Sequence, residues 1–93
     1  MIRSFRCKET KRLFDRSPSR RWRSIERVVR RKLEMLNAVT LLADLAVPPS
    51  NRLEALKGDR RGQHSIRIND QYRVCFAWKE DGPHDVEITK HYR

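Results

Sequence analysis

The chain has 93 residues and a formal net charge of +10, with 38% hydrophobic and 37% charged residues. This length fits one small domain, residues 1–93, and the periodic apolar blocks, with few Gly and Pro, exclude a low-complexity or disordered chain. The richest apolar stretch, residues 36–47, is well short of the roughly 20 residues that span a bilayer, and the first residues lack the apolar segment of a secretory signal, so we expect a cytoplasmic protein with no membrane partner.

The first third of the chain shows one short strand pattern and then helical patterns. Residues 2–5 predict a strand, and residues 8–15 predict a short helix. Residues 17–19, Ser-Pro-Ser, break that helix, and Ser19 is suited to cap the next one. In this second helix, apolar residues recur at steps of three and four, as one buried helix face requires: Trp22, Ile25, Val28, Val29, Leu33 and Leu36.

The chain then changes to short elements and to a period of two. Residues 41–45 predict one further helical turn, and the prolines in residues 48–51 predict an extended connection. We expect strands at residues 53–56, 65–68, 73–78 and 86–89, with tight turns at residues 69–71 and 81–83.

This element order, β-α-α-β-β-β-β, predicts an α+β fold in which two N-terminal helices pack on one face of a small twisted antiparallel sheet. If Val74, Phe76 and Trp78 face the helices, the period of two places Arg73 on the opposite, open face.

The positive charge is concentrated in residues 1–32, which hold thirteen Lys or Arg and three acidic residues, whereas residues 33–93 hold nine of each sign. A merely solvated helix face would mix Glu with Lys, so this one-sided segment favours attraction to a polyanion. Nucleic acid and an acidic protein partner both satisfy it. The candidate phosphate-binding residues in this segment are Arg20, Arg21, Arg23 and Arg27.

No metal or cofactor site is expected. Cys7 and Cys75 are too far apart in sequence for a metal-binding knuckle, and we expect both thiols to be reduced. The three histidines lack zinc-ligand spacing, and glycine-rich phosphate loops are missing from the sequence.

The strand half carries cationic and titratable residues of the kinds that handle phosphates. Lys and Arg stabilise the charge of a pentacovalent phosphorane, while His and Tyr transfer protons to and from ribose and leaving-group oxygens. RNA supplies its own nucleophile, the 2′-hydroxyl, so these groups suffice for a metal-free ribonuclease. The opposing interpretation is a decorated loop and a frayed tail. The candidates are Lys57, Arg60, His64, Arg73, Lys90, His91 and Tyr92.

Several segments resemble the HigB-type toxins of the RelE/ParE superfamily, the killer halves of bacterial toxin–antitoxin pairs, over nearly the whole chain. The resemblance rests on MIRSF at residues 1–5, RRW at 20–22, PPSNRLEALKGDR at 48–60, GQHSIRINDQYRVCF at 62–76 and VEI at 86–88.

The resemblance implies a toxin that enters the ribosomal A site, cleaves mRNA without a metal, and is silenced by a HigA-like antitoxin from the same operon. It also implies that the toxin–antitoxin complex binds operator DNA. Carried over by position, Lys57 matches a catalytic lysine and Arg73 a phosphate-contacting arginine. This chain departs from the family pattern at two places. It has Glu54 where well-studied members carry His, and it has Lys90-His91-Tyr92 where many members end in Asp-Tyr-His.

We therefore expect His91 to be the principal proton-transfer group, with Tyr92 assisting and Lys57, Arg73 and Lys90 stabilising charge. Two alternatives remain open at this point. A ParE-like protein of the same superfamily would keep the fold, lack the ribonuclease groups and inhibit DNA gyrase. A plain RNA-binding module would bind without chemistry.

Overall fold

The structure, a computed structural model, describes residues 1–90. These residues form an α+β fold, as predicted, with helices α1 (Lys8–Phe14) and α2 (Glu26–Ala38) and a four-stranded antiparallel sheet. The sheet order is β1-β2-β3-β4, and the strands are β1 (Glu54–Ala55), β2 (Gln63–Arg67), β3 (Tyr72–Lys79) and β4 (Gly82–Lys90). Short 3-10 turns link them: η1 (Arg23–Ile25), η2 (Leu42–Ala46), η3 (Pro49–Asn51) and η4 (Gly58–Arg60).

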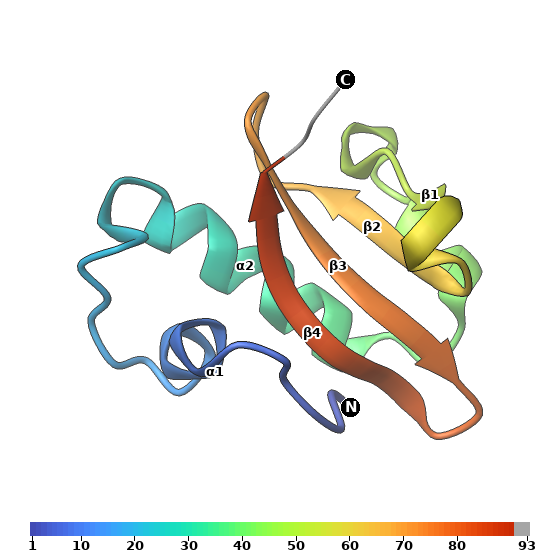
Figure 1. The fold of residues 1–93 in the computed structure, drawn as a ribbon, viewed down its shortest axis with the longest axis horizontal. Helices are drawn as coiled ribbons and strands as arrows, with labels where there is room; N and C mark the ends of the chain where they lie inside the picture. The colour runs from blue at the N-terminus through green and yellow to red at the C-terminus, as the bar shows by residue number, and fades with distance from the viewer. Residues whose placement is uncertain (91–93) are drawn as a thin grey trace.

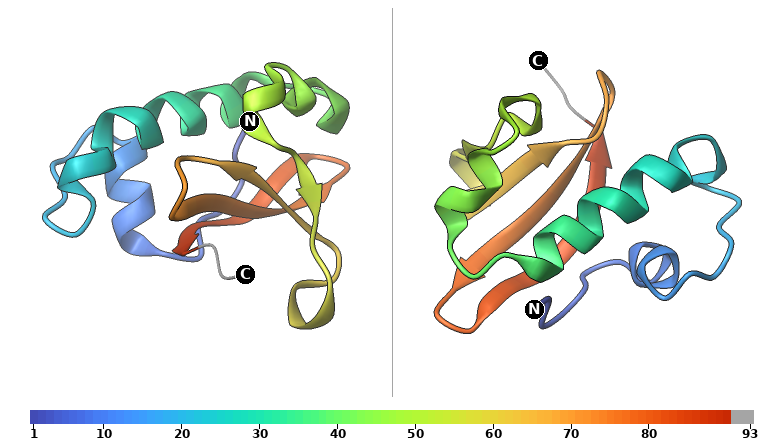
Figure 2. Two further views of the ribbon diagram at one scale, coloured as in Figure 1. Left: turned by 90° about the horizontal axis from the view of Figure 1, so that it is seen from above. Right: turned by 180° about the vertical axis from the view of Figure 1, so that it is seen from behind.

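Helix α2 lies along one face of the twisted sheet, and α1 packs against α2 and the β4 side (Figures 1 and 2). Val29, Leu33 and Leu36 form the fully buried stripe of α2, because steps of four and three keep them on one side of the helix. They share the core with Val74 and Phe76, which alternate along β3. No helix within residues 1–90 is long and apolar enough to cross a membrane.

The expected cap at Ser19 is wrong. The α-helix begins only at Glu26, after the η1 turn, and has no side-chain cap. Ser19 is buried, and its hydroxyl instead accepts a bond from the Trp22 amide at 3.4 Å and donates to Glu9 at 3.0 Å. Ser19 therefore fixes a turn before the helix rather than the helix itself.

The extended connection expected at residues 48–51 is also wrong, because Pro49–Asn51 forms the η3 turn. Asn51 is fully buried and explains the turn. Its amide nitrogen donates to the Leu45 carbonyl at 3.0 Å, and its amide oxygen accepts from Lys32 on α2 at 2.5 Å. These bonds hold the segment against α2. Burial among these groups lowers the pKa of Lys32, with Arg31 and Arg67 adding to the shift.

The strand expected at residues 2–5 is not formed as a regular strand. Phe5 makes a single parallel bridge to Val86, and the Arg3 and Arg6 amides donate to the carbonyls of Pro83 and Val86. Asp85 has a φ of 54°, and the register of β3 and β4 shifts beside it. Such a bulge interrupts regular pairing, so the N-terminal segment bonds to β4 on both sides of Asp85 without forming a regular strand.

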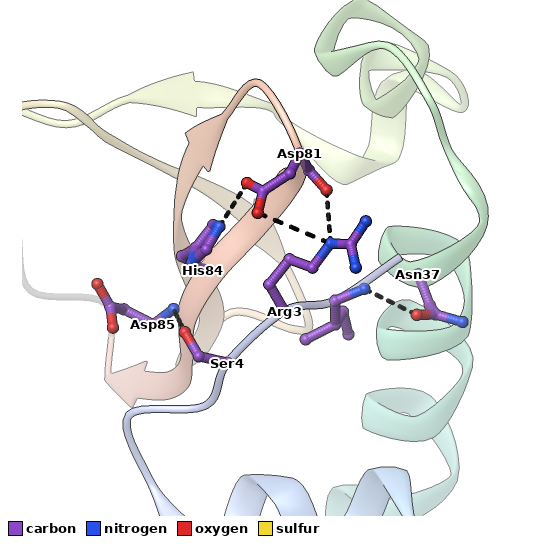
Figure 3. Close-up of polar contacts among 7 residues, drawn as sticks. Arg3, Ser4, Asn37, Asp81, His84 and Asp85 are labelled. Carbon is purple, nitrogen blue, oxygen red and sulfur yellow. Dashed lines mark hydrogen bonds and ion pairs between the residues drawn. The ribbon is translucent and has the colours of Figure 1, made fainter.

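Side chains hold the N-terminal segment at the start of β4 (Figure 3). Arg3 donates to the Asp81 carbonyl at 2.8 Å, and the Ile2 amide donates to Asn37 of α2 at 2.8 Å. The Asp81 carboxylate lies 2.6 Å from His84, and this hydrogen bond lowers the pKa of Asp81. Because β4 already begins at Gly82, the turn expected at residues 81–83 lies one residue earlier, at residues 80–81.

Candidate functional site

The sheet face turned away from α2 carries polar side chains in register. Ser65 of β2 pairs with Cys75 of β3, and Cys75 pairs with Glu87 of β4. Arg73 and Thr89 form the next row on the same face. Since antiparallel partners project to the same side, this polar face is a direct result of alternation along three strands.

Arg73 lies on this face, as predicted, but it is not open there: the residue is only 6% exposed. One guanidinium nitrogen donates to the Ser65 hydroxyl at 2.6 Å, and two nitrogens contact the two Glu54 carboxylate oxygens at 3.1 Å each. The side chain is buried because it lies flat across β2 to reach β1. A bidentate ion pair of this kind fixes the orientation of the Arg73 guanidinium and the position of its charge.

Arg60 is held over the β4 side of the polar face. Its guanidinium contacts Glu87 at 2.8 Å and donates to Gln63 at 3.1 Å. Glu87 also lies 3.8 Å from Arg6 of the N-terminal segment. This acid, with a side chain 15% exposed, therefore joins η4, β4 and the N-terminal segment.

Cys75 lies between Arg73 and Arg60 on this face, and it is a free, buried thiol. Its sulfur is 3.1 Å from the Thr89 hydroxyl. Burial raises the pKa of the Cys75 thiol, and the Thr89 bond only partly offsets that shift. The neutral thiol is thus the favoured form of Cys75 within the polar face.

A groove of about 430 Å³ opens at the end of β4. It brings together three of the sequence-predicted phosphate-binding residues, Arg21, Arg60 and Lys90, which come from the α1–α2 connection, η4 and β4. The other lining residues are Trp22, Tyr72, Glu87, Ile88 and Thr89. Three cations from separate elements and one paired acid give this groove a positive charge.

The remaining sequence-predicted cations lie elsewhere. Arg23 and Arg27 line a second groove of about 530 Å³ along the outer side of α2, with Arg16, Arg30 and Arg31. Glu26 and Glu34 also line it and pair with Arg30 and Arg16. Arg20 lies in a separate hollow beside Glu9 and Arg12. The predicted basic residues therefore divide between two main surfaces.

Lys57 is exposed and immediately precedes the η4 turn. Its amino group forms no ion pair with any residue from 1 to 90, so its charge is available. His91 and Tyr92 lie outside the described residues. Lys90, which they follow in sequence, is the last described residue and lines the groove at the end of β4.

His64, by contrast, belongs to the helix-covered side. It pairs with Phe76 across the sheet, and its ring stacks on Phe76 at a centroid distance of 6.3 Å. Among residues 1–90, no group of three His, Cys, Asp or Glu side chains gathers at metal-binding distance.

Sequence reasoning missed two groups that shape the site. Glu54 was noted only as a departure from a family pattern, yet it is the acid that orients Arg73. Glu87 was not singled out, yet it holds Arg60. Knowledge of the strand register would have identified both acids, because Glu54 lies opposite Ser65 and Glu87 lies opposite Cys75 on one face of the sheet.

The chain that carries this polar face and groove is similar to known proteins. A family described as the RelE-like toxin of the type II toxin–antitoxin system HigB matches residues 3–91. The chain belongs to the HigB-like toxin family. The HigB match gives no support to the ParE-like alternative.

Two curated relatives are similar to this HigB-like toxin. A Vibrio cholerae protein named Toxin HigB-1 is 51% identical over 55 residues, which cover 59% of this chain and 58% of the relative. An uncharacterized protein of Haemophilus influenzae is 32% identical over 68 residues, which cover 73% of this chain and 67% of that protein. The chain thus spans somewhat under two thirds of the length of Toxin HigB-1.

Proposed function

We propose that this HigB-like toxin is a ribosome-dependent endoribonuclease that cleaves mRNA in the ribosomal A site without a metal. The observation that carries the proposal is the convergence of Arg21, Arg60 and Lys90 in one groove, which adjoins the polar face that holds Arg73. Convergent cations of this kind suit a phosphodiester and the extra charge that develops on it during cleavage.

The proposed chemistry is an in-line attack by the ribose 2′-hydroxyl of the mRNA. The 2′-oxygen forms a bond to phosphorus as the bond from phosphorus to the 5′-oxygen breaks, leaving a 2′,3′-cyclic phosphate and a 5′-hydroxyl. His91 is the proposed principal proton-transfer group, with Tyr92 assisting. Lys57 and Lys90 stabilise the charge on the phosphorane.

Arg73 contributes charge from a fixed position in this scheme. Glu54 and Ser65 hold its guanidinium from the side of β1 and β2. A charge that two partners hold in place needs no reorganisation when a phosphate binds nearby, which is the advantage of a preorganised site.

The second groove, along α2, is the proposed docking surface for ribosomal RNA. Arg23, Arg27 and Arg31 succeed one another at steps of four along one side of the helix and its preceding turn, and all three are exposed. Within residues 1–90 they form no ion pair. Arg20 extends the same basic segment toward its N-terminal end. Such a stripe follows a phosphate backbone without reading its sequence.

A HigA-like antitoxin from the same operon is the proposed protein partner, since the family is defined by the toxin–antitoxin system that it serves. We propose that the toxin–antitoxin complex binds operator DNA and that the toxin acts in the cytoplasm, where ribosomes and mRNA meet it.

Primer extension on a defined mRNA in a purified translation system tests this function. The wild-type protein should cut within the A-site codon only when ribosomes are present. Lys57→Ala should lower the cleavage rate by about 100-fold, because one charge-stabilising group is lost from the transition state. Folding should be unaffected, because Lys57 is exposed and unpaired within residues 1–90.

Lys8→Ala is the matched control, because Lys8 is an exposed lysine at the start of α1 and does not line the groove at the end of β4. It should cleave at the wild-type rate. Cleavage by Lys57→Ala within a few-fold of wild type would remove Lys57 from the site, and His91→Ala is judged by the same criterion. No cleavage by the wild-type protein would overturn the proposed function.

A further inference from the structure

Arg21 and Trp22 form a stacked pair at the end of the α1–α2 connection. The guanidinium carbon of Arg21 lies 4.6 Å from the centroid of the Trp22 ring. Arg21 is exposed, whereas Trp22 is only 5% exposed. The buried indole therefore supports an exposed cation on its face, an arrangement that the ring quadrupole stabilises.

The indole is itself fixed from the sheet side. Tyr72 of β3 meets Trp22 edge to face, with centroids 5.2 Å apart and planes at 80°. Trp22 belongs to the main hydrophobic core, and Tyr72 packs against that core. A guanidinium that lies on so rigid a support keeps a defined plane.

The Arg21 side chain lines the same groove as two further cations. Arg60 and Lys90 line it from η4 and from the end of β4. Glu87, the acid of the groove, already pairs with Arg60 at 2.8 Å. Within residues 1–90, Arg21 and Lys90 form no ion pair, so their charges are available to a ligand.

We propose that this groove binds one nucleotide of single-stranded RNA, with its base stacked on the guanidinium of Arg21 and its phosphate held by Lys90 and Arg60. The proposal rests on the proposed ribonuclease function and assigns that site a subsite for a nucleotide beside the cleaved bond. Unpaired bases stack on arginine planes as they do on aromatic rings. A carboxylate of an acidic peptide would pair with the edge of the Arg21 guanidinium and would leave the exposed face of that group without a stacking partner.

Base stacking and phosphate attraction are separated by two probes. One is a four-nucleotide 2′-O-methyl oligoribonucleotide, which cannot be cleaved because its nucleophile is blocked. The other is an abasic oligonucleotide with the same number of phosphates. Binding is followed by tryptophan fluorescence in a Trp78→Phe background, which leaves Trp22 as the only reporter.

We expect the base-containing probe to bind about five-fold to ten-fold more tightly than the abasic probe and to change Trp22 emission. Arg21→Lys keeps the charge and loses the plane, so this preference should disappear while binding of the abasic probe is retained. Arg52→Lys is the matched control, because Arg52 is an exposed arginine outside the groove. It should retain the preference.

Four results would overturn the inference: equal affinity for the two probes, a preference that survives in Arg21→Lys, an equal loss in Arg52→Lys, or no binding of either probe. Tighter binding of a tetraglutamate peptide than of the base-containing probe would instead assign the groove to an acidic protein. Primer extension with ribosomes judges the proposed function separately, because wild-type cleavage can be present when the probe preference is absent.

Discussion

The buried position of Arg73 depends on both of its partners. Ser65 and Glu54 together occupy the two terminal nitrogens of the guanidinium, and Glu54 is half exposed on β1. Burial of a charge is tolerated only where such bonds compensate for lost hydration. The same two contacts that make Arg73 stable therefore also orient it on the polar face.

Arg73→Lys should lower the free energy of unfolding by about 1–2 kcal/mol, because an ammonium cannot reproduce the two-pronged contact with Glu54. Urea unfolding of the purified protein measures this loss. Arg67→Lys is the matched control on the neighbouring strand, and it should change stability by less than about 0.5 kcal/mol because its side chain is partly exposed. Equal losses in the two variants would show that the contacts of Arg73 with Ser65 and Glu54 contribute no more to the free energy of unfolding than the partly exposed contact of Arg67.

Among the elements, the N-terminal segment and the start of β4 stabilise each other at a glycine. Gly82 has a φ of 123°, and a Cβ atom there would lie 2.7 Å from the Met1 carbonyl oxygen. The Arg3 and Arg6 amides bond to the strand just beyond this point. Glycine is therefore required twice, for its backbone angle and for the close approach of Met1.

Gly82→Ala should destabilise the protein by about 1 kcal/mol more than Gly62→Ala. Gly62 also has a positive φ, of 91°, but a Cβ there would meet no atom within 4 Å, so it isolates the cost of the backbone angle. Thermal unfolding gives the two losses, and hydrogen exchange at Arg6 should accelerate only in Gly82→Ala. If the two variants lose the same stability, the Met1 contact contributes nothing.

Periodicity in the sequence was sufficient to predict α1, the buried face of α2 and the three longer strands, because each buries one face with a regular repeat. It failed where a single side chain decides the backbone. Ser19 bonds to Trp22 instead of capping α2, and Asn51 holds residues 49–51 in a turn. Such bonds depend on groups that become neighbours only after folding, so no local sequence pattern predicts them.

The candidate site was predictable by residue type but not by arrangement. The sequence predicts Arg21, Arg60 and Lys90 as phosphate-binding residues, and the fold brings them together from distant parts of the chain. The division of Arg23 and Arg27 onto another groove was not foreseen, because α2 turns that side of the basic segment away from the groove at β4. The pairing of Arg73 with Glu54 required the register of β1.

At the scale of the whole molecule, about half of the net charge of +10 lies in two basic grooves, one at the end of β4 and one along α2. If about five phosphates are neutralised together, the logarithm of ribosome affinity should fall with the logarithm of salt at a slope of about −3.5. That slope corresponds to roughly a 100-fold loss between about 50 and 200 mM salt. Sedimentation with ribosomes measures it, and a flat salt dependence would exclude the grooves as docking surfaces.

The claim that the mRNA supplies the nucleophile is tested most directly by removing one oxygen from the substrate. Programmed ribosomes carry either an all-ribose mRNA or the same mRNA with a single 2′-deoxy nucleotide at the cleaved position, and wild-type protein is added. We predict that the ribose message is cut to a 2′,3′-cyclic phosphate end and that the deoxy message stays intact. Cleavage of both messages at the same rate would contradict the account.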